Sequence, residues 1–144
     1  MVNADLVTAK LAELADRMAR VRARSPATPE ALAADRDALD LVAFNLMLAV
    51  QSCLDIASHV IADEGWPPAT TLAGAFDRLR ERGVLSTDTS DALARAAGLR
   101  NVVAHGYAGI DSLRVHAAAT QGMAHLEAFA QQVAAWVESA PRAG

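Results

Sequence analysis

The stretch of sequence that decides the fold is DALDLVAFNLMLAVQSCLDIASHVIAD, residues 37–63. Its apolar residues recur at steps of three and four, the spacing that places side chains on one face of an α-helix. That face carries Leu39, Ala43, Leu46, Val50, Leu54, Ala57 and Ile61. We expect the helix to begin at Pro29, behind Thr28 as N-cap, and to end at about Asp63, because the two prolines of Gly65-Trp-Pro-Pro68 cannot continue it. The sequence therefore predicts one long helix over residues 29–63.

Four more helices are predicted around this one, at about residues 3–22, 71–81, 88–105 and 112–138. The first has a single apolar stripe formed by Val7, Leu11, Leu14, Met18 and Val21. No segment has the pattern of a convincing strand, and the connections are short. The sequence therefore predicts an all-α fold, a five-helix up-and-down bundle in a single domain over residues 1–144.

The composition agrees with a helical protein of the cytoplasm. Hydrophobic residues make up 53% of the chain and aromatic residues only 4%, and alanine, the best helix former, supplies much of the apolar share. The single cysteine, Cys53, excludes an intramolecular disulfide and is expected as a buried thiol. Residues 1–5 lack the pattern of a secretory signal, and no unbroken apolar run approaches the roughly 20 residues of a membrane span. We expect a soluble, cytoplasmic protein.

The net charge of −4, with a pI near 5.5, argues against a protein that coats nucleic acid non-specifically. It does not exclude an enzyme that holds one or two phosphates in a local cleft. Four arginines gather at the end of the first predicted helix: Arg17, Arg20, Arg22 and Arg24. Two interpretations of them stay open, helix capping with solubility or an RNA-facing patch.

The histidines and the cysteine do not predict a metal site. His59, His105, His116 and His125 lack the spacing of a zinc-binding helix, and one cysteine is too few for a Cys-rich zinc site. The chain also has no Gly-rich phosphate loop and no nucleophile elbow. We therefore expect neither a structural metal nor a cofactor.

The segment with recognisable chemistry is GLRNVVAHGYAG, residues 98–109. Arg100, Asn101, His105 and Tyr107 are interleaved there with small or apolar residues at a predicted helix end. On an ideal helix Arg100 and His105 would lie about 140° apart. They can meet at one phosphate if the helix unwinds around Gly106, with help from a second copy of the chain.

Such a group suits RNA cleavage without a metal. A histidine can take the proton of the 2′-hydroxyl or protonate the leaving 5′-oxygen, and an arginine stabilises the charge that builds on the phosphoryl oxygens. Asn101 can orient the phosphate or fix a tautomer, and Tyr107 can stack on a base, donate to a phosphate or accept a modification. Taken singly, His105 is also explained as a helix cap or core residue, and Arg100 as a surface ion-pair partner.

Gln51, Asp55 and His59 form a second polar group on the long helix, with Ser58 beside them. Their spacing of four residues puts them on one face, where Asp55 can raise the pKa of His59 or fix its tautomer. They are either a surface row of hydrogen bonds or the wall of a dimer cleft opposite Arg100 and His105. We assign them a supporting role.

The pattern Arg100-Asn-x-x-x-His105-x-Tyr107 resembles the R-x4-H-x-Y signature of HEPN-domain proteins, in the form found in HepT-like toxin ribonucleases. The row from Gln51 to His59 and the run Pro68…Phe76…Leu79…Gly83 resemble the same family. The likeness extends over about residues 33–115.

The resemblance implies a five-helix HEPN bundle and a homodimer that brings two copies of the motif to one cleft. It implies the toxin of a type VII toxin–antitoxin pair, a metal-independent endoribonuclease acting on tRNA or mRNA. Its antitoxin would be a minimal nucleotidyltransferase of the MNT type, which silences the toxin by AMPylation. Carried over to this sequence, Arg100 and His105 are the catalytic pair, Asn101 assists, and Tyr107 accepts AMP.

Two other functions fit the same residues. One is a nucleotide- or RNA-binding module of the HEPN fold without catalysis. The other is a structural subunit that binds a nucleotidyltransferase and is modified by it.

Overall fold

The computed structural model describes residues 1–104 and 111–140, with side chains for residues 1–99 and 111–140. Within these residues the chain forms six helices and no strand. They are α1 (Ala4–Arg24), α2 (Pro29–Ala34), α3 (Arg36–Asp63), α4 (Leu72–Glu81), α5 (Thr87–Ala104) and α6 (Ser112–Ser139). The predicted all-α class is confirmed, and the predicted number of five helices is wrong.

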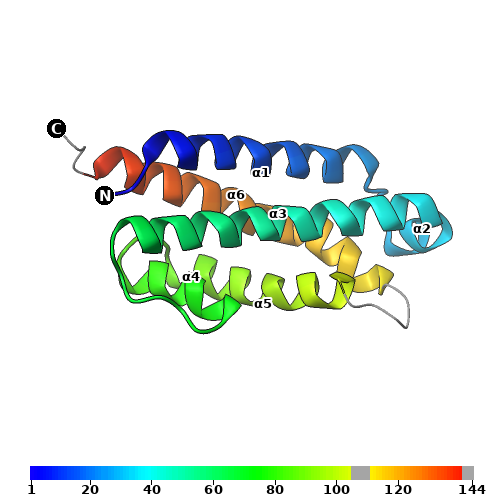
Figure 1. Ribbon diagram of the computed structural model, residues 1–144. Helices are drawn as coiled ribbons and strands as arrows, with labels where there is room; N and C mark the ends of the chain where they lie inside the picture. The colour runs from blue at the N-terminus through cyan, green and yellow to red at the C-terminus, as the bar shows by residue number, and fades with distance from the viewer. Residues whose placement is uncertain (105–110, 141–144) are drawn as a thin grey trace.

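The four long helices run up and down as a bundle, as Figure 1 shows. α3 crosses the middle of the view, with α1 on one side, α5 on the other and α6 passing behind it. The two short helices lie at opposite ends: α2 packs against α3 and α6, and α4 packs against α3 and α5. The order α1, α3, α5, α6 is therefore the up-and-down topology that the sequence predicts.

The predicted helix over residues 29–63 is two helices, because the chain leaves the helical conformation at Asp35 (φ −113°, ψ 93°). The first begins as expected: the Thr28 hydroxyl accepts from the Ala31 N–H at 3.1 Å, and Pro29 opens the first turn. At Asp35 the carboxylate accepts from the Ala38 N–H at 3.1 Å and caps α3. An aspartate at an N-cap satisfies a backbone donor that would otherwise have no partner, so a new helix starts there.

α3 holds the core together. All seven residues that the sequence places on its core face are buried, and Cys53 is buried with them. The helix ends before the prolines, at Gly65, whose positive φ of 69° suits a residue without Cβ. There the Trp66 N–H donates to the Ile61 carbonyl at 3.0 Å. The end of α3 is thus set by a glycine cap, and the prolines follow it.

The apolar character of α3 comes from its central position. It is the one helix in the described residues that is long and apolar enough to cross a membrane, with a mean hydropathy of 1.6 over its best window. However, 56% of that window is buried against the other helices, as in the core helix of a soluble protein. Packing within the bundle accounts for the composition of α3.

We predict that Asp35→Ala lowers the free energy of unfolding by about 1 kcal/mol, because the first turn of α3 loses its side-chain cap. Asp35→Asn is the matched control, since asparagine caps as well as aspartate and should change stability by only a few tenths of a kcal/mol. Urea denaturation followed by circular dichroism measures both. Equal losses in the two variants would show that the charge of Asp35, and not its capping bond, stabilises the joint.

Candidate functional site

The predicted motif lies at the end of α5 and in the connection to α6. The backbone of Arg100 and Asn101 belongs to the last turn of α5, while their side chains lie outside the described residues. His105 and Tyr107 lie outside them altogether. The next described residue, Asp111, is the N-cap of α6 and accepts from the Leu113 N–H at 3.0 Å. The roles assigned to the four motif residues therefore stay predictions.

The end of α5 lies against the N-terminal half of α3, at the end of the bundle where α1 ends and α2 lies (Figure 1). Leu99, the last α5 residue with a described side chain, lines a small cavity of about 50 Å³ together with Leu46 of α3 and Leu126 of α6. This cavity is apolar and has no room for a nucleotide. It serves to fix the level at which the motif begins, opposite the middle of α3.

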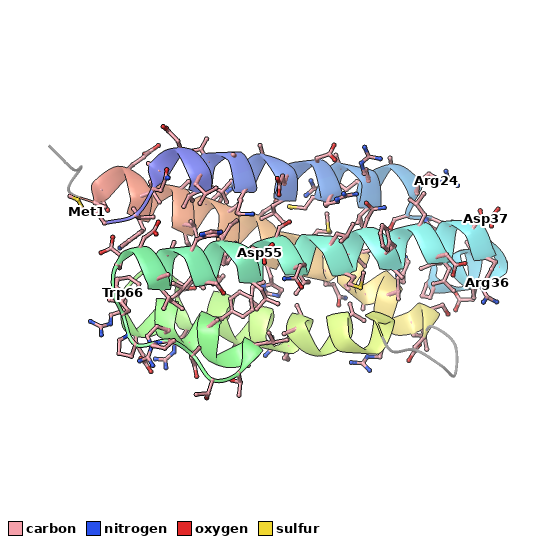
Figure 2. The ribbon with its side chains drawn as sticks, viewed as in Figure 1. Met1, Arg24, Arg36, Asp37, Asp55 and Trp66 are labelled. Carbon is pink, nitrogen blue, oxygen red and sulfur yellow. The ribbon has the colours of Figure 1, made fainter. Side chains whose placement is uncertain are left out.

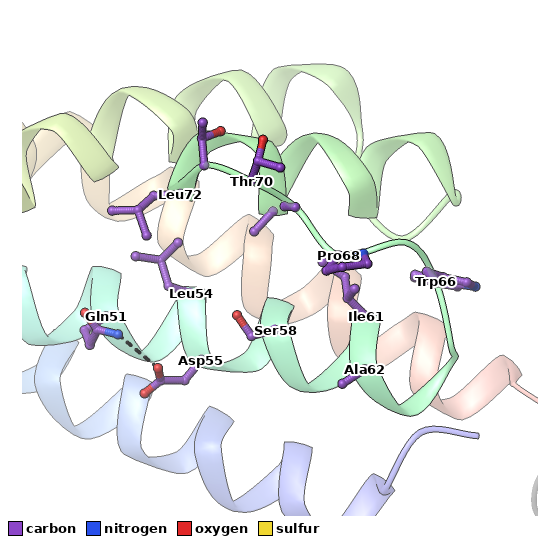
Figure 3. Close-up of a pocket in the computed structure, with 13 residues that line it drawn as sticks. Gln51, Leu54, Asp55, Ser58, Ile61, Ala62, Trp66, Pro68, Thr70 and Leu72 are labelled. Carbon is purple, nitrogen blue, oxygen red and sulfur yellow. Dashed lines mark hydrogen bonds between the residues drawn. The ribbon is translucent and has the colours of Figure 1, made fainter.

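The supporting row on α3 is partly assembled. The Gln51 amide donates to the Asp55 carboxylate at 2.9 Å, as the dashed line in Figure 3 shows. In the part of the chain that the structure describes, no hydrogen bond or ion pair joins Asp55 to His59. An α-helix rises 1.5 Å per residue, so Gln51 lies about 8 Å and His59 about 20 Å along α3 from Leu46. Gln51 is therefore nearest the level of the motif, and His59 is farthest from it.

Gln51 and Asp55 also border a groove of about 670 Å³ between α3, the segment 66–71 and the start of α4 (Figure 3). Its other walls are largely apolar and include Leu54, Ile61, Trp66, Leu72 and Ala75. A groove of this size with an apolar floor and one carboxylate at its edge suits an apolar group that also carries a hydrogen-bond donor.

The sequence-based prediction did not include this groove. It treated Gly65-Trp-Pro-Pro68 only as a helix stop, yet the Trp66 ring packs edge to face on Trp136, 5.7 Å between centroids. The Arg82 guanidinium lies 5.4 Å from the Trp66 ring centroid, a cation–π distance. A tryptophan between a glycine and two prolines was the one signal in the sequence that this turn is packed.

The arginines at the end of α1 are mostly occupied by other side chains. Arg17 donates to the Asn45 side chain at 3.2 Å, and Arg20 pairs with Asp16 at 3.0 Å. Arg22 pairs with Glu127 of α6. Among the described residues only Arg24 of the four has no such partner. The arrangement favours the structural interpretation of this cluster over a continuous RNA-facing patch.

Two further side chains have structural surroundings. A ring nitrogen of His116 lies 3.2 Å from the Pro26 carbonyl, which ties α6 to the turn after α1. Burial raises the pKa of the Cys53 thiol well above its usual range, so the thiolate needed for nucleophilic attack does not form there. Within residues 1–104 and 111–140, no three His, Cys, Asp or Glu side chains come together as metal ligands.

The chain matches the family described as Ribonuclease HepT-like over residues 13–133, well over half of its length. It therefore belongs to the ribonuclease HepT-like family, as the motif and its surroundings predict. A curated relative, the mRNA nuclease HepT of Shewanella oneidensis, is 29% identical over 93 residues, which cover 64% of this chain and 67% of that protein.

Solved structures share the fold. A toxin–antitoxin complex with AMP-PNP contains a chain that superposes with a TM-score of 0.84 at 21% identity, covering 91% of this chain and 98% of that one. A tri-AMPylated HEPN toxin of Shewanella oneidensis in complex with an MNT antitoxin gives a TM-score of 0.83 at 22% identity, with the same coverage. At these identities the likeness establishes the helical architecture.

We predict that the Cys53 thiol reacts with a thiol reagent at pH 8 at least about a hundredfold more slowly in the native protein than in urea, because attack requires the bundle to open. Ser58→Cys places an exposed thiol on the same helix and should react at once. Absorbance of the released chromophore measures both rates. Fast labelling of Cys53 in the folded wild type would contradict its burial.

Proposed function

We propose that this chain is the toxin of a toxin–antitoxin pair and acts in the cytoplasm as a metal-independent endoribonuclease. The observation that carries the proposal is the family match over residues 13–133, which contains the whole motif from Arg100 to Tyr107. The relative named mRNA nuclease HepT supports the choice of RNA as substrate.

The proposed reaction is an internal transfer at one phosphate. The 2′-oxygen attacks the neighbouring phosphorus while His105 takes its proton, and the bond to the 5′-oxygen breaks as that oxygen is protonated. The products are a 2′,3′-cyclic phosphate and a 5′-hydroxyl end. Arg100 stabilises the charge on the phosphoryl oxygens, since its planar guanidinium stays protonated and can donate two parallel hydrogen bonds.

A homodimer would give the reaction both an acid and a base. Since Arg100 and His105 are about 140° apart on an ideal helix, one copy of the motif does not readily surround a phosphate. Two copies facing one cleft supply two imidazoles, one to accept the proton and one to return it, and two guanidinium groups. Asn101 would orient the phosphate, and Gln51, Asp55 and His59 would support the cleft from α3.

The proposed partner is an MNT-type nucleotidyltransferase antitoxin that transfers AMP to Tyr107. The AMPylated Shewanella oneidensis toxin bound to an MNT antitoxin, whose fold this chain shares, supports this form of control. Tyr107 is the single tyrosine of the chain and stands two residues after His105. An AMP group attached there adds negative charge and bulk beside the proposed phosphate site, and would exclude RNA.

We predict that Arg100→Ala and His105→Ala each reduce cleavage of total RNA by at least about a hundredfold, the usual contribution of general acid–base or charge-stabilising groups. The assay contains a chelator, and cleavage is measured on denaturing gels. Arg95→Ala, an exposed arginine on the same helix, and His125→Ala, an exposed histidine on α6, are the matched controls and should cut normally.

The outcomes of this assay separate the functions. Full cleavage by both motif variants would remove the assigned roles, and a strict need for a divalent metal would contradict the mechanism. Tight RNA binding by a wild type that does not cut would identify a binding module.

We predict that co-expression with the cognate nucleotidyltransferase adds whole AMP units to the mass of the wild-type chain and none to Tyr107→Phe. Intact-mass spectrometry measures this directly. Copurification of Tyr107→Phe with the antitoxin is the control that the two proteins still meet. AMP increments that persist in Tyr107→Phe would place the acceptor on another residue.

A further inference from the structure

The outward face of α3 carries an apolar patch next to the level of the motif. Phe44 is 51% exposed and Leu41 is 36% exposed, one turn apart on the same helix. Met47 and Leu48, partly exposed, continue the patch by another turn. Single exposed apolar residues are ordinary, but four together on one helix face in a chain with 4% aromatic residues indicate a surface that is covered.

An acidic groove adjoins this patch. It lies between α1 and α3, encloses about 480 Å³, and is lined by Glu13, Asp16, Leu48 and Asp55 among others. Asp16 is paired with Arg20, but Asp55 uses only one carboxylate oxygen, toward Gln51. Among the described residues its other oxygen has no hydrogen-bond partner.

A cation without a close partner stands at the other side of the patch. The Arg36 side chain is 82% exposed, and its contact with Asp40 is long, at 3.5 Å. Figure 2 shows Arg36 and Asp37 at the start of α3 and Asp55 well along the same helix. The face therefore has a cation at one end, an apolar centre, and a carboxylate groove at the other end.

We propose that this face binds a second copy of the chain, with the two α3 helices antiparallel and Phe44 at the two-fold axis. In that register, residues equally far before and after Phe44 face each other across the interface. Leu41 then faces Met47, and Asp37 faces the Gln51 amide. Arg36 faces Ser52, within reach of Asp55 in the groove. A two-fold interface requires this kind of self-complementary surface, at the shallow crossing of about 20° that keeps long helices in contact.

The arrangement deepens the proposed function and rests on it in one respect, the need for two motifs at one cleft. Leu99 is level with Leu46, only two residues past Phe44. The backbone of residues 100–104 continues from there along α3, so the last turn of α5 begins close to the two-fold axis. Rotation about an axis across α3 keeps both α5 helices on the same side, which brings the two motif segments together.

A second copy fits this face better than RNA does. Phosphate would be repelled by Glu13 and Asp55 and would find an apolar centre instead of cations. A second copy supplies the apolar surface and the arginine that the face lacks on each side. An antitoxin seated here is the other outcome of the test.

The first experiment compares self-association by sedimentation equilibrium. The wild type should be a dimer at micromolar concentration, and Phe44→Asp should raise the dimer dissociation constant at least about a hundredfold, since each dimer loses two central side chains. Leu113→Asp is the control. Leu113 is 64% exposed on α6, which lies behind α3 (Figure 1), and this variant should stay dimeric. Circular dichroism checks that both variants keep their helices.

The second experiment tests the register. Arg36→Glu should weaken the dimer about tenfold, although an acidic residue in the first turn of α3 favours the helix itself. Adding Asp55→Arg should restore the affinity, because the two charges are exchanged. Phe44→Cys should form a disulfide between two chains on oxidation. Ala62→Cys, exposed on the same helix but about 27 Å further along, should not.

The outcomes separate the interface from the function. A monomeric wild type, including one that associates only with the antitoxin, would overturn the interface, and so would a Phe44→Asp variant that stays dimeric. Failure of the charge exchange would overturn the antiparallel register. A wild-type dimer that depends on Phe44 but does not cut RNA would refute the nuclease and leave the interface standing.

Discussion

α3 packs against every other helix in the described residues, and the rest of the molecule depends on that packing. Half of its 28 residues are buried, so α1, α5 and α6 each find an apolar surface along a different side of the same rod. The helix is too long and too apolar to be stable at the surface of a protein, and its neighbours in turn bury their own stripes against it. The position of the motif follows, because α5 is held at a fixed level on α3 through Leu99 and Leu46.

Much of this fold could be predicted because the periodicity of α3 is local information. The seven core residues, the Thr28 cap and the glycine stop are each decided by residues within one or two turns. The break at Asp35 was missed although its signal is local too: Ala33 and Ala34 are strong helix formers, and their propensity masked an aspartate able to cap a new helix. Trp66 was missed for a different reason, since its partners Arg82 and Trp136 are distant in the sequence.

The candidate site divides in the same way. The spacing of Arg100, Asn101, His105 and Tyr107 can be read from the chain, and the family match supports the family to which it points. How those side chains meet a phosphate depends on contacts between helices, and on a second copy, which spacing does not contain. The bond from Gln51 to Asp55 was predictable as an i, i+4 contact. The engagement of Arg17 by Asn45 and of Arg22 by Glu127 was not, because it required knowing that α1 lies between α3 and α6.

The contact between His116 and the Pro26 carbonyl has a mechanical consequence. α2 has six residues and could not hold its shape alone, but Leu32 is fully buried, and α2 packs on both α3 and α6. The turn after α1 thus acts as a strut for the beginning of α6, directly after the motif segment. The segment is suspended between two anchors, one of which is set by residues some eighty positions earlier. Nuclease activity will therefore depend on a corner of the molecule that never touches RNA.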